Sequence, residues 1–134
     1  MPFVVDASVA ATWLLPDERP PEAEASYALL SDDYALVPTL WWYEMRNVFV
    51  VNERRGRIDR SQSDKALSVV AGLPIQLDRE QDEGPLLDLA RQHRLTVYDA
   101  AYLELAQRRG LGLATLDRAL VKAARAERIT VIGD

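Results

Sequence analysis

Short runs of apolar, β-forming residues alternate with longer helical patterns along most of this chain. A run of three or four such residues, bounded by polar or turn residues, is typical of a buried strand. Strands that alternate with helices favour a parallel sheet with helices on both faces. The strands predicted in this way are residues 3–5, 35–37, 75–77, 111–114 and 129–132.

The helices predicted between these strands end mostly at proline or glycine, the two residues that most often interrupt a helical pattern. Thr39 stands where it could cap the longest helix. The chain shows no internal repeat and no long linker, so we expect one α/β domain over residues 1–134. The predicted helices are residues 9–15, 22–30, 39–55, 61–71, 81–93, 96–109 and 117–127, with a charged, proline-rich loop at 16–21.

The composition limits the kinds of metal site that the chain can build. Cysteine is absent and His93 is the only histidine, which excludes disulfides, thiolate sites and multi-histidine zinc sites. A metal would have to be bound mainly by carboxylate oxygens, which favours Mg²⁺ or Mn²⁺.

The charge and hydropathy patterns bear on partners and location. The chain has 21 acidic and 16 basic residues, a formal charge of −5, which argues mildly against a nucleic-acid binder. That objection weakens if several acids surround a bound cation. The N-terminus resembles no secretion signal. The apolar stretch at 37–51 is interrupted by polar residues and is too short to span a bilayer, so we expect a cytoplasmic protein without a membrane segment.

Glu44 is the acid that is most out of place. In a helix it lies along the apolar stripe of Leu40, Trp41, Val48 and Val51. A carboxylate in such a place needs a cation, a metal or a proton. A functional role and a salt bridge to an arginine such as Arg46 both remain open.

Asp6 and Asp117 each follow a predicted strand. Ligands of open parallel sheets bind at the carboxyl ends of strands, which favours a functional role. Each aspartate could instead simply cap the helix that follows it. Ser8 and Thr115 lie close to them in sequence and could orient a carboxylate or a water, or could make local turn bonds.

Asp99 has the spacing of a capping box with Thr96, although Asp replaces the usual Glu or Gln. That structural role does not exclude a functional one at the start of the helix. Other acids, including Asp78 and Asp82, are interpreted as solvated surface.

Four of these acids, taken together, indicate a candidate metal site. If the sheet is parallel, Asp6, Glu44, Asp99 and Asp117 could converge on one edge of it. Four carboxylates in one cleft repel each other unless a cation lies among them. Mg²⁺ suits such a site, since it binds a few carboxylates, waters and phosphate oxygens, and it could promote phosphoryl displacement by water.

The order and spacing of these motifs resemble those of PIN-domain proteins, specifically VapC-type toxin ribonucleases. The resemblance covers essentially the whole chain. The segments that carry it are Val-Val-Asp6-Ala-Ser8, Glu44 in the long helix, Tyr98-Asp99-Ala-Ala-Tyr102 and Leu113-Ala-Thr115-Leu-Asp117.

The resemblance implies a PIN-like three-layer sandwich and a Mg²⁺- or Mn²⁺-dependent endoribonuclease that is the toxin of a type II toxin–antitoxin pair. It implies that Asp6, Glu44, Asp99 and Asp117 hold the metal, with Ser8 or Thr115 in support. It also points to a homodimer and to a separately encoded antitoxin. The predicted helix at 39–55 agrees with a protein partner, because apolar residues occupy nearly all its sides and one stripe cannot bury them all.

Four arginines near the end of that helix are candidates for RNA binding. Arg46, Arg54, Arg55 and Arg57 form the densest basic stretch and could bind phosphates. Bases are also favourable at a helix C-terminus for electrostatic reasons alone, so both interpretations stay open.

Other protein classes fit the sequence less well. A receiver-type signalling domain needs an adjacent acidic pair after the first strand and a late lysine in the sheet, whereas Asp6 stands alone and Lys122 falls in a predicted helix. A haloacid-type phosphatase would have an aspartate where Ser8 stands. A catalytically silent PIN fold used only for binding remains an alternative.

Overall fold

A computed structural model describes residues 1–15 and 19–133. Its sheet consists of β1 (Phe3–Val5), β2 (Ala35–Pro38), β3 (Ile75–Asp78) and β4 (Gly112–Ala114), all parallel, in the order β3-β2-β1-β4. The three residues of β1 are buried, as expected for a strand of a parallel sheet that is covered on both faces. The carboxyl ends of β2 and β4 therefore flank that of β1.

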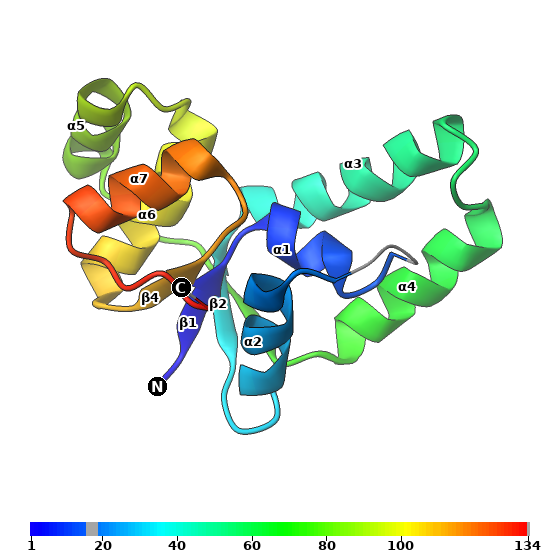
Figure 1. Cartoon of the computed structure of the whole chain (residues 1–134). Helices are drawn as coiled ribbons and strands as arrows, with labels where there is room; N and C mark the ends of the chain where they lie inside the picture. Colours follow the sequence, from blue (N-terminus) through cyan, green and yellow to red (C-terminus); the bar gives the residue numbers. More distant parts are fainter. Residues whose placement is uncertain (16–18, 134) are drawn as a thin grey trace.

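Helices cover both faces of this sheet, and the predicted three-layer α/β sandwich is confirmed. Figure 1 shows α5, α6 and α7 on one side and α1 to α4 on the other. The predicted loop at 16–21 falls partly on residues 16–18, which lie outside the described residues. The helices are α1 (Ala7–Thr12), α2 (Pro21–Leu29), α3 (Leu40–Arg54), α4 (Arg60–Gly72), α5 (Glu83–His93), α6 (Val97–Arg109) and α7 (Arg118–Ala126).

Helix α6 holds the centre of the fold, because it contacts β1, β2 and β4. Its buried side chains include Leu103 and Leu105, and each such burial stabilises the fold by about 1.5–3 kcal/mol. On the other face, α3 contributes the buried Met45 and Phe49. These two helices bring Asp99 and Glu44 to the sheet from opposite sides.

The predicted strand at 129–132 is wrong. Of its residues only Val131 pairs with the sheet, as an isolated parallel bridge to Leu113. The chain enters this segment after Arg128, whose backbone has a positive φ of 60°, and it turns again immediately after Val131. These turns leave too short an extended stretch for a strand.

Two predicted helix starts also differ from the structure. Helix α1 begins at Ala7 rather than at Val9, because Asp6 at the end of β1 serves directly as its N-cap. The capping role predicted for Thr39 is wrong, since its backbone is already helical and its side chain makes no capping bond.

Helix α3 has apolar residues on more than its buried face. Trp41, Met45 and Phe49 are buried, whereas Trp42 and Tyr43 are 44% and 71% exposed. This confirms the expectation that one stripe cannot bury all the apolar residues of this helix. In the part of the chain that the structure describes, no helix is long and apolar enough to cross a bilayer.

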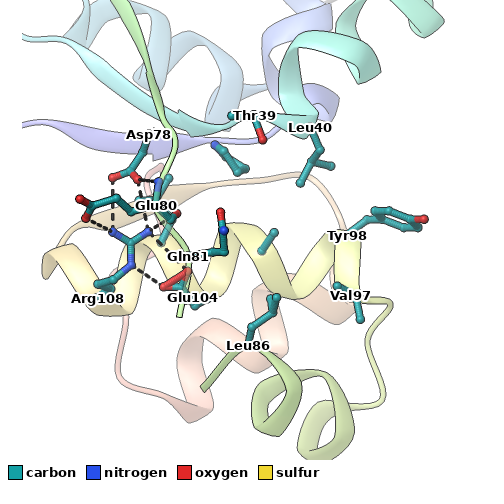
Figure 2. Close-up of a pocket in the computed structure, with 13 residues that line it drawn as sticks. Thr39, Leu40, Asp78, Glu80, Gln81, Leu86, Val97, Tyr98, Glu104 and Arg108 are labelled. Atoms are coloured by element: carbon teal, nitrogen blue, oxygen red, sulfur yellow. Dashed lines mark hydrogen bonds and ion pairs between the residues drawn. The ribbon is translucent and has the colours of Figure 1, made fainter. Parts of the chain in front are cut away.

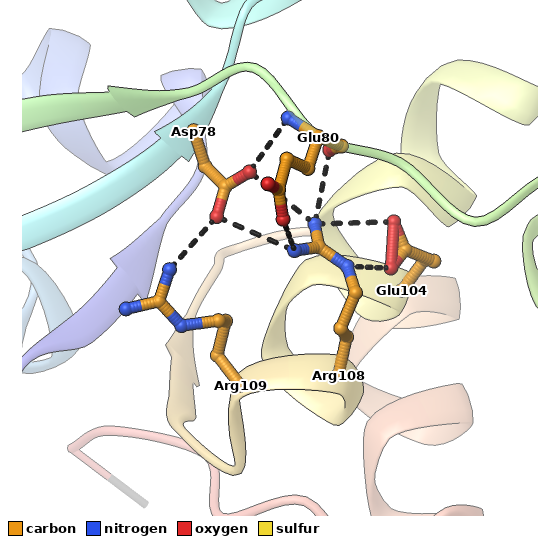
Figure 3. Close-up of polar contacts among 5 residues, drawn as sticks. All are labelled: Asp78, Glu80, Glu104, Arg108 and Arg109. Carbon is orange, nitrogen blue, oxygen red and sulfur yellow. Dashed lines mark hydrogen bonds and ion pairs between the residues drawn. The ribbon is translucent and has the colours of Figure 1, made fainter.

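The interpretation of Asp78 as solvated surface is wrong. Asp78 ends β3 and is buried, where it accepts hydrogen bonds from Arg108 and, at 3.1 Å, from Nη1 of Arg109. Arg108 also donates from Nε to Glu104 at 2.6 Å and from Nη2 to the Glu80 carbonyl at 3.0 Å (Figure 3). This charged cluster joins the end of β3 to the last turn of α6.

Candidate active site

Asp6 stands at the carboxyl end of the central strand and is buried. Its Oδ1 accepts hydrogen bonds from the Ser8 hydroxyl at 2.5 Å and from the Val9 N–H at 3.1 Å. Its Oδ2 accepts from the Thr115 hydroxyl. Both carboxylate oxygens are thus held in fixed directions by neighbours on α1 and after β4.

The segment after β4 carries Thr115 and Asp117 to the same edge. The Thr115 oxygen accepts from the Asp117 N–H at 3.0 Å, and the Leu116 N–H donates to Ser8 Oγ at 3.2 Å. Asp117 caps α7, since its Oδ1 accepts from the Leu120 N–H at 2.9 Å. The structure therefore joins Ser8 and Thr115, the two predicted supporting residues, to the predicted acids.

Glu44 lies on the second turn of α3 and is partly buried. Its Oε1 accepts a hydrogen bond from the Tyr102 hydroxyl. Arg46 does not pair with it, because the guanidinium of Arg46 stacks on Trp42 at 3.8 Å from the ring centre and donates to the Trp42 carbonyl. The salt bridge considered for Glu44 and Arg46 is therefore wrong.

Asp99 lies in the first turn of α6 and is partly buried. Thr96 caps this helix, as its spacing predicts, by accepting from the Asp99 N–H at 3.0 Å. The positive ends of the α6 and α7 dipoles thus lie beside Asp99 and Asp117, and they favour negative charge there. The capping and functional interpretations of these positions are compatible.

Electrostatic repulsion connects the four acids in a ring. Burial raises the pKa of Asp6, and the charge of Asp117 raises it further. Burial likewise raises the pKa of Glu44, helped by the charges of Asp6 and Asp99. The pKa of Asp99 is raised by burial and then by Asp117. Neighbouring carboxylates thus repel one another, and a cation among them would relieve that repulsion.

The donor set of this ring fits Mg²⁺ or Mn²⁺. Among the described residues, no three histidine, aspartate or glutamate side chains are arranged to hold a metal as they stand. Mg²⁺ does not require such a cage, because it keeps several waters and takes one or two carboxylates together with substrate phosphates. The donor set itself is the indication, since four neighbouring carboxylates would have their repulsion relieved directly by a divalent cation.

Tyr102 is the member of this site that sequence reasoning did not find. It is 2% exposed and lies three residues after Asp99, on the same side of α6. This spacing from Asp99 could have indicated a place in the site, but a tyrosine in an apolar helix is ordinarily a core residue. The partner on α3, 58 positions away, becomes visible only in the fold.

Three of the four candidate RNA-binding arginines, Arg54, Arg55 and Arg57, lie far along the chain from Glu44. Arg54 is ten residues beyond Glu44, about 15 Å along α3 at 1.5 Å per residue. Arg55 caps the end of this helix, and Arg57 donates to Asn52 at 3.4 Å. Arg54 and Arg55 therefore lie at the opposite end of α3 from Glu44, whereas Arg46 is only two residues from it.

A small cavity of about 180 Å³ lies beside the site but is separate from it. In Figure 2, Leu40, Leu86 and Val97 surround it and the Arg108 cluster lies at one end. None of the four acids of the ring lines this cavity. This cavity therefore belongs to the surroundings of Arg108 and not to the four acids.

Comparison with known proteins places these features in a family. The model of the PIN domain family matches residues 3–126. Ribonuclease VapC3 of Pyrobaculum aerophilum is 34% identical over 125 residues, which cover 91% of this chain and 94% of that protein. These matches overturn the receiver and phosphatase alternatives.

Solved structures agree with this result. PAE2754 from Pyrobaculum aerophilum superposes with a TM-score of 0.70 at 25% identity, over 92% of this chain and 84% of that one. FitAcB from Neisseria gonorrhoeae has a TM-score of 0.60 at 18% identity, over 98% and 96% of the two chains, and its likeness shows the fold alone. The sequence matches, the sheet order and the structural likeness lead to one conclusion: this chain belongs to the PIN domain family and, within it, to the VapC group.

Proposed function

We propose that this protein is a Mg²⁺- or Mn²⁺-dependent endoribonuclease, formed by one PIN domain over residues 1–134, that acts in the cytoplasm as the toxin of a toxin–antitoxin pair. The observation that carries this proposal is that hydrogen bonds through Ser8, Thr115 and Tyr102 hold together the segments that bear Asp6, Glu44, Asp99 and Asp117. We assign metal binding to these four acids, with Ser8 and Thr115 in support.

The bound metal would supply charge to offset that of the phosphodiester and would lower the pKa of a water. Asp6 is the best-held ligand, because hydrogen bonds from Ser8 and Thr115 fix both of its oxygens. The N-termini of α6 and α7 add partial positive charge, which suits an anionic phosphate. In the proposed reaction the water oxygen bonds to phosphorus while the bond to the 3′ oxygen breaks. The 3′ oxygen takes a proton, which leaves a 5′-phosphate and a 3′-hydroxyl.

RNA is the proposed substrate because the relative that is 34% identical to this chain is named a ribonuclease. Arg46, Arg54, Arg55 and Arg57 are the proposed contacts to more distant phosphates, because they are the densest bases on an otherwise acidic chain.

The exposed apolar residues of α3 support a protein partner. Trp42, Tyr43 and Val50 are all more than 40% exposed, and exposed apolar patches commonly mark interaction sites. We propose that this chain forms a homodimer and binds a separately encoded antitoxin. Co-expression with the neighbouring small open reading frame should yield a stable, inactive complex. A strictly monomeric protein by sedimentation, harmless to its host when expressed alone, would count against both assignments.

The activity is tested by incubating the purified protein with total RNA, with Mg²⁺ and with excess EDTA. We expect discrete fragments with Mg²⁺ and intact RNA with EDTA. Cleavage that persists in EDTA would overturn the metal dependence. Failure to cut any RNA under both conditions would favour the alternative of a catalytically silent PIN fold.

A further inference from the structure

Tyr102 is a buried polar residue that joins two helices of the candidate site. It lies on α6, one turn after Asp99, and its ring is within the core. Its hydroxyl donates to Oε1 of Glu44 on α3. The hydroxyl thus joins the helix that carries Asp99 directly to Glu44.

The hydrogen bond to Glu44 fixes the direction of the hydroxyl proton. A phenol can donate one hydrogen bond, and an ionised carboxylate can only accept. The hydroxyl proton is therefore directed at Oε1 of Glu44. Glu44 therefore acts as an acceptor. Among the hydrogen bonds of the described residues, only its Oε1 is engaged, so Oε2 remains able to bind a cation or its water.

Glu44 needs such a restraint more than Asp6 and Asp117 do. Asp6 is held by three hydrogen bonds, and Asp117 is held by its capping bond. Glu44 has a longer side chain with more rotatable bonds, and the charges of Asp6 and Asp99 repel it. Without the tyrosine, this repulsion would favour rotamers that turn the carboxylate away from the ring.

We infer that Tyr102 is a positioning residue that pins the Glu44 carboxylate for metal binding. This inference rests on the proposed function, since it assumes that Glu44 is a ligand. Residues that orient a metal ligand typically contribute 10–100-fold to affinity. Loss of the Tyr102 hydroxyl should therefore weaken metal binding while the fold is kept.

The test compares Tyr102→Phe with Tyr98→Phe, which makes the same change at a tyrosine of the same helix that is 67% exposed. Mn²⁺ affinity is measured on the purified metal-free proteins at one pH. Tyr102→Phe should bind Mn²⁺ about tenfold more weakly, and Tyr98→Phe should match the wild type. In a Glu44→Gln background, Tyr102→Phe should cause no further loss. Equal affinity in Tyr102→Phe and the wild type would overturn the inference.

A measurement on the wild type covers the case in which Tyr102→Phe does not fold. With ¹³C-labelled tyrosine, addition of Mg²⁺ should shift the Cζ resonance of Tyr102 and leave that of Tyr98 in place. An unmoved Tyr102 resonance at saturating Mg²⁺ would contradict the inference.

The two proposals fail in different ways. If the wild type binds Mn²⁺ but cuts no RNA, the ribonuclease proposal fails. The ratio of the Mn²⁺ affinities of the wild type and Tyr102→Phe still decides the role of Tyr102. If the wild type cuts RNA and Tyr102→Phe binds Mn²⁺ equally well, only the role of Tyr102 fails. If the wild type binds neither Mn²⁺ nor Mg²⁺, both are overturned. A cleavage defect in Tyr102→Phe that excess Mg²⁺ repairs would support positioning, since structural damage would not respond to metal.

Discussion

The hydroxyl of Thr115 donates a hydrogen bond to Oδ2 of Asp6, and it thereby joins two residues that are 109 positions apart in the sequence. The same oxygen accepts from the Asp117 N–H at 3.0 Å. Thr115 is buried, so water cannot readily replace it as a donor. The Thr115 hydroxyl thus orients the carboxylate of Asp6 and holds the backbone of Asp117 in place.

Thr115→Val removes this hydroxyl with little change of shape. The buried Asp6 would lose a donor, which costs about 1–3 kcal/mol of unfolding free energy. That bond lowers the pKa of Asp6 against the effect of burial, so its loss should raise the pKa further. A raised folded pKa destabilises the protein as pH rises, and the cost should therefore be larger at pH 7 than at pH 4.

Urea unfolding at the two pH values measures this cost. Thr130→Val is the matched control, because Thr130 is exposed, and it should stay within about 0.5 kcal/mol of the wild type. A cost for Thr115→Val that is equal at both pH values would mean that the hydroxyl does not act through the Asp6 charge.

The positions of Asp6 and Asp117 were predictable because the carboxyl ends of parallel strands share one edge, and the alternation of strands and helices predicts parallel strands. Glu44 was predictable because a charge on an apolar stripe needs a partner. The partner itself was not, since Tyr102 reaches Glu44 only after α6 and α3 pack on the sheet from different sides. Asp78 was missed for the same reason: its arginine partners lie 30 and 31 positions away.

The metal-free protein should lose stability relative to Asp99→Asn as pH rises. The pKa of Asp99 is raised in the folded state, so this group contributes stability below its unfolded pKa of about 3.9. That contribution is lost as pH increases through the folded pKa. The difference in unfolding free energy between the wild type and the variant should therefore move against the wild type between pH 4 and pH 7.

Adding Mg²⁺ should restore the unfolding free energy that the wild type loses as pH rises, and it should not do so in Asp99→Asn. Free Mg²⁺ at about ten times its Kd would add about 1.4 kcal/mol. Denaturant unfolding with EDTA and with Mg²⁺ measures both effects. If the two proteins instead keep a constant difference across pH and respond equally to Mg²⁺, Asp99 is not part of a cation site.

Arg108→Met should destabilise the fold by about 3 kcal/mol at pH 7, because it leaves two buried acids without their main cation. Those acids are Asp78 and Glu104, whose side chains are 5% and 4% exposed. Burial alone would raise the pKa of Asp78, but hydrogen bonds from Glu80 and Arg108 and the charges of Arg108 and Arg109 hold it below its usual value. Its stabilising contribution is present above the unfolded pKa of about 3.9 and is lost as pH falls through the folded pKa.

Arg109→Met is the comparison for this cluster, because the Arg109 side chain is 44% exposed and is paired with Asp78 and not with Glu104, so its loss should cost less than the loss of Arg108. Thermal or urea unfolding at pH 7 and at pH 3 separates the two variants. The Arg108→Met deficit should shrink at pH 3. Equal stability of the two variants at pH 7 would show that Arg108 is not the main counter-charge.

The double variant Arg54→Ala/Arg55→Ala should weaken RNA binding and reduce the slope of log affinity against log salt by about 0.7 for each phosphate that is no longer bound. Both residues lie at the end of α3 away from Glu44, so the cleavage chemistry should be unchanged at saturating RNA. Affinity is measured across a salt series with inactive Asp99→Asn as the background. An unchanged slope would remove these two arginines from the RNA site. They would then be explained only by the favourable position of basic residues at a helix C-terminus.

The chemistry of the cut ends tests the central claim most directly. RNA cleaved by the wild type in Mg²⁺ should carry a 5′-phosphate and a 3′-hydroxyl, as attack by water requires. Asp99→Asn should reduce the rate by more than about a hundredfold, since loss of a ligand should exceed the 10–100-fold cost of losing a residue that orients one. The exposed Asp82→Asn should cut normally. Fragments with 2′,3′-cyclic phosphate ends, or unchanged cleavage by Asp99→Asn, would contradict the account.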